Sequence, residues 1–246
     1  MSSDPESPIP RYTPIPILHA HDPLIPFPSS QIFPLAHPPP KPPQRLRLTP
    51  RLVLQIQQLA SSTGRAVPVL EVLRPSRLGR TLAVGGAARV KLSSRGLYIA
   101  QSEPFLHLPG SSTALPCDAV AAISSLSPRG APAADVLYFA AADSWEVHRS
   151  PRGYRFQQMV AGGQGKTLEW EERPRASEER FVLRVVPAAA EEAEDLRLAT
   201  MTKRGIKVSA WDRGLGAYLA VEEETVYTWV LTMGVYVAAQ EGWACV

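Results

Sequence analysis

The stretch "EEETVYTWVLTMGVYVAAQE", residues 222–241, decides the fold, because it carries no charge from Thr225 to Gln240 and its apolar residues lie on every side of a helical wheel. A helix that is apolar all round has to be buried. The uncharged part is shorter than the ~20 residues that a bilayer core requires, and the acids before it suit a helix N-terminus. The stretch therefore predicts a buried helix at about 223–241, with one or two final strands as the alternative.

Short segments of alternating apolar and polar residues dominate the chain between about residues 67 and 211. They are rich in β-branched and aromatic residues and are separated by turn residues, a pattern typical of an antiparallel barrel or sandwich. Three connections, 76–87, 109–134 and 173–179, are expected to be loops, the second with a short helix at 118–124. The segments expected to form strands are 67–73, 89–92, 96–101, 135–140, 144–149, 153–160, 167–172, 180–186, 196–202 and 206–211.

Prolines separate the beginning of the chain from the rest. Fifteen of the 25 prolines lie among the first 50 residues, and proline neither continues a helix nor donates to a strand ladder, so residues 1–45 are expected to form a disordered tail. Residues 46–246 are expected to form a single β-rich domain. A short helix at 50–62 should open this domain, because Thr49 suits the N-cap, Pro50 suits the first helical position, and the following apolar residues repeat at helical spacing.

The tail contains "PPPKPPQR", residues 38–45. Pro40, Pro43 and Arg45 have the spacing at which a polyproline helix presents two prolines and a cation to an aromatic groove, so they predict binding by a polyproline-reading domain. The first residues are acidic and broken by prolines, unlike a secretory signal, and the two cysteines are far apart. We therefore expect an intracellular protein, cytoplasmic or peripheral at membranes.

The segment "GGQGKT", residues 162–167, resembles the end of a phosphate-binding loop. That motif requires a further glycine five residues before Gly165, where this chain has Val160, and it requires a helix after the loop. The following "TLEWEE" alternates like a strand instead. The segment therefore predicts a hairpin loop between two strands.

The sequence offers no pattern for catalysis, a cofactor or a metal. It lacks the Gly-x-Ser-x-Gly nucleophile motif, and His19 and His21 lie on the tail without the further ligands of a zinc site. Tyr154 and Phe156 share one face of a predicted strand and are expected in the core, not stacked on nucleic-acid bases. We expect neither an enzyme built on a known motif nor a nucleic-acid-binding protein.

The end of the chain resembles a known superfamily. Many short strands are followed by "RLATMTKRGIKVSAWD", residues 197–212, then by the apolar stretch and "EGWACV". This order resembles the tubby C-terminal-like superfamily, which includes the plant LURP-one-related proteins and the phospholipid scramblases; the proline-rich tail resembles uncharacterised fungal proteins. The resemblance spans about 67–246 in architecture, and the insert at 109–134 departs from it. It implies a closed antiparallel barrel around a hydrophobic helix and a non-catalytic module that binds anionic lipid headgroups.

Basic residues supply the candidates for such binding. The first group surrounds the Gly205 turn and comprises Lys203, Arg204 and Lys207, and the second comprises Arg74, Arg77 and Arg80. Lysine offers phosphate a point charge and arginine a bidentate fork, although exposed charges can equally pair with glutamates in the fold. The alternative functions are a small-molecule enzyme or carrier that uses the barrel interior, and a protein scaffold that acts through the tail. The sequence does not predict an oligomeric state.

Overall fold

The computed structural model describes residues 30–39, 48–59, 65–84, 88–102, 119–124, 126, 135–139, 143–161, 163, 165–174, 180–187, 196–210, 219–221 and 223–244. The elements are β1 (Gln31–Ala36), β2 (Arg51–Leu59), β3 (Ala66–Arg74), β4 (Arg80–Val84), β5 (Ala88–Leu92), β6 (Leu97–Gln101), β7 (Ala121–Ile123), β8 (Asp135–Phe139), β9 (Ser144–Ser150), β10 (Gly153–Gln158), β11 (Thr167–Glu172), β12 (Phe181–Val186), β13 (Arg197–Thr202), β14 (Gly205–Val208) and α3 (Glu223–Gln240).

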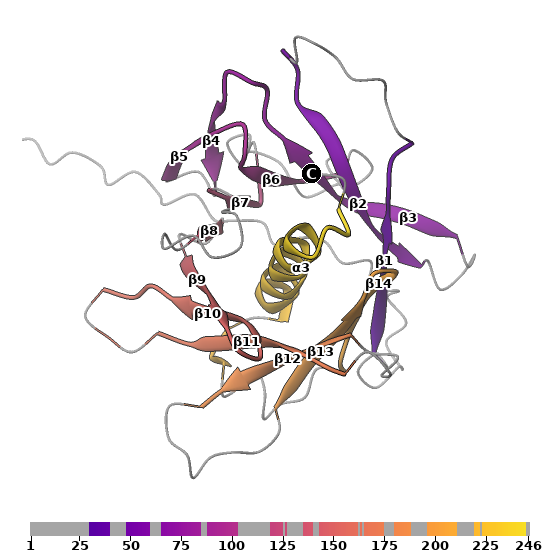
Figure 1. Ribbon diagram of the computed structural model, residues 1–246, viewed down its shortest axis with the longest axis vertical. Coiled ribbons are helices and arrows are strands. Elements are labelled where there is room, and N and C mark those ends of the chain that lie inside the picture. The colour runs from indigo at the N-terminus through magenta and orange to yellow at the C-terminus, as the bar shows by residue number, and fades with distance from the viewer. Residues whose placement is uncertain are drawn as a thin grey trace, which may run out of the picture.

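Twelve antiparallel strands close into a barrel, in the order β1-β14-β13-β12-β11-β10-β9-β8-β7-β6-β3-β2 (Figure 1). The strand β1 closes the ring, because its first four residues pair with β14 and its last two pair with β2. Pro34 lies where β1 changes partner from β14 to β2. Proline has no amide hydrogen to donate, and at this position the missing donor does not interrupt either ladder in mid-strand. Each of these twelve strands therefore has a paired neighbour on both sides.

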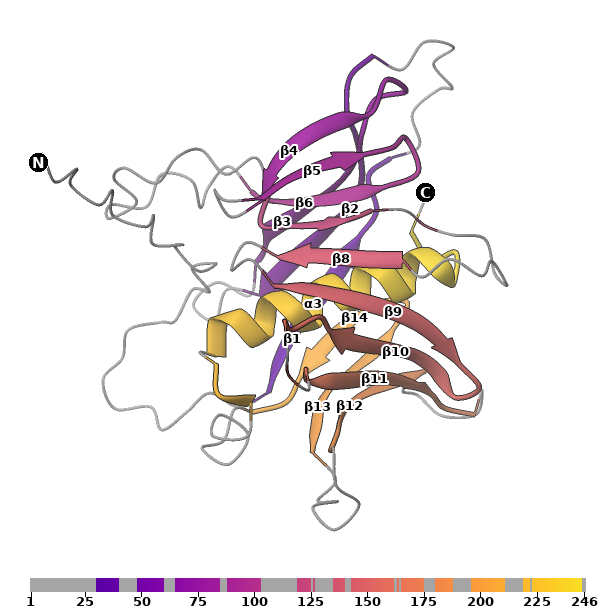
Figure 2. The same cartoon turned by 90° about the vertical axis from the view of Figure 1, so that its left-hand side faces the viewer.

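The helix α3 fills the barrel, as the apolar stretch predicted, and the alternative of final strands is wrong. Figure 1 shows α3 inside the ring of strands, and Figure 2 shows it running lengthwise through the ring. All its residues from Val226 to Ala239 are buried. The Trp229 ring lies edge-on to that of Trp145, 5.0 Å between centroids. At Gly234 a Cβ would collide with the Cδ1 atom of Ile206, so glycine permits the helix to approach β14 closely.

A separate hairpin, β4–β5, lies outside the barrel against β6 and β7 (Figure 1). Its inward side chains, Leu82, Val84, Val90 and Leu92, form a second apolar cluster with Tyr98 and the small residues Ala119 and Ala122. The alternation of β6 explains how one strand serves two cores: Leu97 and Ile99 belong to the main core, whereas Tyr98 between them faces the hairpin.

Each of the ten segments predicted as strands contains a strand, and Tyr154 and Phe156 are buried in the core as predicted. The predicted helix at 50–62 is wrong. The segment forms β2, with Leu54, Ile56 and Gln58 buried and Gln55 and Gln57 less so, because pairing with β1 and β3 outweighs local helical spacing.

Three further predictions need correction. The sequence predicts a disordered tail at 1–45, but β1 at 31–36 is part of the barrel; residues 1–29 and 40–47 lie outside the described residues. The connection 76–87 contains β4 in place of a continuous loop, because Leu82 and Val84 face the second apolar cluster. The expected short helix at 118–124 is the strand β7, which fits between β6 and β8.

The two ends of the barrel differ. We call the end at which α3 ends the carboxyl end. There the Tyr236 hydroxyl donates to the Asp135 carboxylate, at the start of β8, over 2.9 Å. The strand register places the turns after β3, β5, β9 and β13 at this end as well. No helix in the described part of the chain is long and apolar enough to cross a membrane.

Candidate anion-binding site at the carboxyl end of the barrel

A pocket of about 480 Å³ opens at the carboxyl end between β1, the β13–β14 turn and the residues that follow α3. It combines cationic and apolar side chains from three distant parts of the chain. We call it the carboxyl-end pocket, and its lining residues are Leu35, His37, Lys203, Arg204, Gly242 and Trp243.

The turn that carries Lys203 and Arg204 is fixed on both sides. The Thr202 hydroxyl oxygen accepts a hydrogen bond from the Arg204 amide (3.1 Å), the local bond that stabilises such turns. The Arg204 carbonyl oxygen accepts a bond from the Leu35 amide (2.9 Å), which ties the turn to β1. At Gly205 a Cβ would lie 2.8 Å from the Phe33 carbonyl oxygen, so only glycine allows this approach. Both cationic side chains are therefore exposed on a constrained backbone.

The end of α3 places Trp243 in the same pocket. Gly242 has a left-handed φ of 70° and donates to the Ala239 carbonyl (3.2 Å), while Trp243 donates to the Ala238 carbonyl (2.8 Å). These two bonds are the Schellman motif, which satisfies the last helical carbonyls. The Trp243 ring packs edge-on against Phe181, 5.7 Å between centroids, and the side chain stays half-buried. Its indole therefore gives the pocket a rigid apolar wall.

The acid nearest to the pocket in sequence, Glu241, is already engaged. Its side chain is 8% exposed, accepts a hydrogen bond from the Tyr154 hydroxyl (2.7 Å) and lies 3.7 Å from the Arg180 guanidinium. By contrast, Lys203 and Arg204 form no ion pair with any described residue. The pocket therefore presents two exposed cations whose charge is not cancelled by the described acids.

A buried hydrogen-bond chain anchors this end of α3 to the barrel. The Tyr236 hydroxyl donates to Asp135 and accepts from the side-chain Nε2 of Gln240 (3.3 Å). Burial raises the pKa of Tyr236, and the charge of Asp135 raises it further, so the phenol stays protonated and keeps donating. The helix end that supports the pocket is thus held by polar contacts as well as by packing.

The predicted first group of cations is only partly brought together. Lys203 and Arg204 line the pocket, but Lys207 lies further along β14, opposite Ile32 of β1 and Thr200 of β13, and points outward from the barrel wall. It is exposed and does not line the pocket. The sequence spacing grouped three residues that the turn and the strand separate.

The second predicted group lies at the same end of the barrel but not in the pocket. Arg74 ends β3 opposite Arg51, and Arg77 is exposed in the turn that follows. Arg80 already has a structural role, because its guanidinium donates to the Tyr98 hydroxyl (3.1 Å) and lies over the Tyr98 ring at 5.3 Å. The predicted tail residues Pro40, Pro43 and Arg45 lie outside the described residues.

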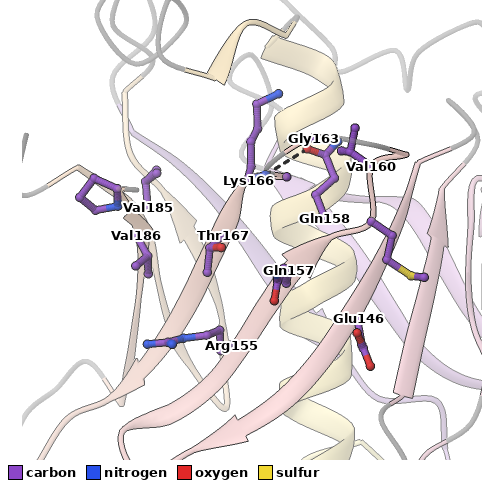
Figure 3. Close-up of a pocket in the computed structure, with 13 residues that line it drawn as sticks. Glu146, Arg155, Gln157, Gln158, Val160, Gly163, Lys166, Thr167, Val185 and Val186 are labelled. Carbon is purple, nitrogen blue, oxygen red and sulfur yellow. Dashed lines mark hydrogen bonds between the residues drawn. The ribbon is translucent and has the colours of Figure 1, made fainter. Parts of the chain in front are cut away.

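A second pocket, of about 700 Å³, lies on the outer wall around the GGQGKT segment (Figure 3). The segment joins β10 to β11 as the predicted hairpin, and no helix follows it. Its cations are engaged: Arg155 pairs with Glu169 at 3.0 Å, and the Lys166 ammonium lies 5.7 Å from the Trp229 ring centroid. With Glu146 also in the lining, this pocket is a poorer place for an anion.

Sequence reasoning missed His37, Leu35 and Trp243 as members of the site. The prolines around β1 predicted a disordered segment, although Phe33 and Leu35 are spaced two residues apart, as apolar residues are on one face of a strand. Gly242, directly after the polar end of the helix, is the signal from which the end of α3, and with it the position of Trp243, could have been predicted. Comparisons of the chain with protein-family models, with curated proteins and with solved structures found no match.

Proposed function

We propose that this protein is a non-catalytic binding module that recognises anionic membrane-lipid headgroups in the carboxyl-end pocket. One observation carries the proposal: Lys203 and Arg204 are exposed on a constrained turn, lack ion pairs with the described residues, and stand beside the indole of Trp243. A phosphate ester offers a charge for the cations and a carbon frame for the apolar wall. His37 adds a third nitrogen donor at the rim.

The architecture supports a place in the tubby C-terminal-like superfamily, which we propose for this chain. The expected features of that resemblance were a closed antiparallel barrel and a hydrophobic C-terminal helix inside it, and both are present. Fold alone does not determine function, so the headgroup proposal rests on the pocket residues.

The filled interior favours binding at the surface. The rival function, a carrier or enzyme that uses the barrel interior, requires a cavity lined with polar groups. In the described residues the interior is occupied by α3, whose Trp229, Val230, Met233 and Val237 are fully buried against the strands. A ligand is therefore better accommodated at the carboxyl end than along the axis.

The expected strength follows from the two cations. A lysine or arginine close to an anionic membrane surface contributes about 1 kcal/mol. Replacing both Lys203 and Arg204 with alanine should therefore cost about 2 kcal/mol, or roughly 30-fold in affinity, since each 1.4 kcal/mol is tenfold. The loss should shrink as salt is added, because exposed charges are screened.

Vesicle flotation tests the proposal with the full chain. Vesicles of phosphatidylcholine alone are compared with vesicles that also contain a phosphoinositide, over a salt series. Lys203→Ala/Arg204→Ala should lose binding as stated, whereas Arg155→Ala/Arg184→Ala, which removes the same charge from the outer wall of β10 and β12, should keep it. Equal losses of binding in the two double variants would show that the effect depends only on net charge. A wild-type chain that binds the vesicles equally well with and without phosphoinositide would refute headgroup recognition.

A further inference from the structure

Two leucines protrude at the carboxyl end of the barrel. Leu78 is 84% exposed and Leu48 is 66% exposed, the highest values among the large apolar side chains of the described residues. Leu48 precedes the start of β2 and Leu78 follows the end of β3. Because Arg51 of β2 pairs with Arg74 of β3, both leucines lie at the same end as the carboxyl-end pocket.

The backbone holds Leu78 outward in a tight turn. The Gly79 amide donates to the Ser76 carbonyl (3.0 Å), and the Ser76 hydroxyl donates to the Gly79 carbonyl (3.3 Å). Gly79 has a left-handed φ of 76°, and a Cβ there would lie 2.6 Å from the Leu92 carbonyl oxygen. The exposure of Leu78 is therefore built into the turn and is not a consequence of a loose loop.

Exposed arginines lie beside this turn. The start of β4 lies beside the end of β5, because Arg80 pairs with Leu92. The turn before β4, which carries Arg77, is therefore next to the turn after β5, which carries Arg95. Both arginines are exposed. The described residues of 72–102 include six arginines or lysines and no acid. An apolar tip beside exposed arginines suits a bilayer, whose phosphates lie above its hydrocarbon.

We propose that Leu48 and Leu78 insert into the hydrocarbon edge of an anionic bilayer while Arg77 and Arg95 contact the phosphates. This inference rests on the proposed function, and it specifies how the molecule sits: the carboxyl end faces the membrane, so the same surface that receives the leucines brings headgroups to the pocket. Among the described residues, the other exposed large apolar side chains do not lie at this end of the barrel. Two protruding leucines near exposed arginines are a better match to lipid than to the apolar centre of a protein interface.

The test uses the full chain and vesicles of equal parts phosphatidylcholine and phosphatidylserine. The variant Leu48→Ser/Leu78→Ser should bind these vesicles at least about tenfold more weakly for the loss of buried leucine surface. The control is Leu59→Ser, which changes a leucine that is 48% exposed at the opposite end of β2 and should bind like the wild type. In a second measurement, each of the variants Leu78→Trp and Leu59→Trp gains one tryptophan, whose fluorescence is the difference from the wild type. Brominated lipid should quench this extra fluorescence in Leu78→Trp but not in Leu59→Trp.

The outcomes separate the two proposals. Binding of soluble inositol trisphosphate should survive Leu48→Ser/Leu78→Ser and weaken in Lys203→Ala/Arg204→Ala. A wild-type chain that binds vesicles, with a leucine variant that binds them equally well and no quenching of Leu78→Trp, would overturn insertion and leave headgroup recognition standing. A wild-type chain that binds neither the anionic vesicles nor the headgroup would overturn both.

Discussion

Replacing Gly242 with alanine perturbs the end of α3 without disturbing any neighbour. Among the described residues beyond its two chain neighbours, no heavy atom lies within 4 Å of the position that a Cβ would take, so the substitution adds no steric overlap with them. What changes is the backbone: the φ of 70° is natural for glycine and strained for alanine. The perturbation thus isolates the conformational requirement of the Schellman motif.

The magnitude follows from two opposing effects. A left-handed conformation costs an L-residue roughly 1–2 kcal/mol. Alanine also restricts the unfolded chain, which returns about 0.4–1 kcal/mol. We therefore expect Gly242→Ala to lower the free energy of unfolding by about 1 kcal/mol and Tm by about 2–4 °C. Gly242→Asn should lose less, because asparagine tolerates the left-handed region.

Urea denaturation followed by tryptophan fluorescence measures this difference. Gly163→Ala is the matched control, since its φ is not left-handed and the nearest atom to its Cβ is 3.8 Å away on Val160. That variant should be as stable as the wild type or slightly more so. A Gly242→Ala chain that unfolds at the same urea concentration as Gly163→Ala, with an unchanged slope, would show that α3 does not end in a left-handed glycine.

Two further substitutions test the packing of α3. Tyr236→Phe removes the donor to Asp135 and should cost about 1–3 kcal/mol at neutral pH. Because the pKa of Tyr236 is raised in the folded state, the stability that its protonated hydroxyl confers is lost above about pH 10, the ordinary tyrosine pKa, so the gap between the variant and the wild type should narrow in alkaline urea titrations. Gly234→Ala should destabilise the protein by about 1–3 kcal/mol through overlap with the Ile206 Cδ1 atom, and adding Ile206→Val, which removes that atom, should restore most of the loss in a double-mutant cycle.

The fold was predictable where the local pattern restricted the possible structures. The stretch that became α3 is apolar on all sides and too short for a bilayer, which left burial in a protein core as the reading. Segments such as "GYRFQQ", with Tyr154 and Phe156 on one face, have a period that only a strand buries. These local signals agreed with the global structure, so they could be read directly.

The errors fall where long-range pairing decides. The segment of β2 has apolar residues that fit both a helix and a strand, and only its pairing with β1 and β3 selects the strand. The carboxyl-end pocket has the same character. Its cations were predictable from the "TKRG" turn, but Leu35 and Trp243 join them only through barrel closure and the end of α3. No local pattern encodes that meeting.

The position of α3 also has a consequence for how the chain folds during synthesis. Among the described strands, β1 is made first and β14 last, and the two pair, so barrel closure joins segments that leave the ribosome far apart in time. The element that fills the interior is made later still. A nascent chain that has not yet reached Glu223 holds the strands of a barrel with nothing to pack inside, a state that exposes apolar surface and invites aggregation. We therefore expect this protein to acquire its core only after translation has passed α3.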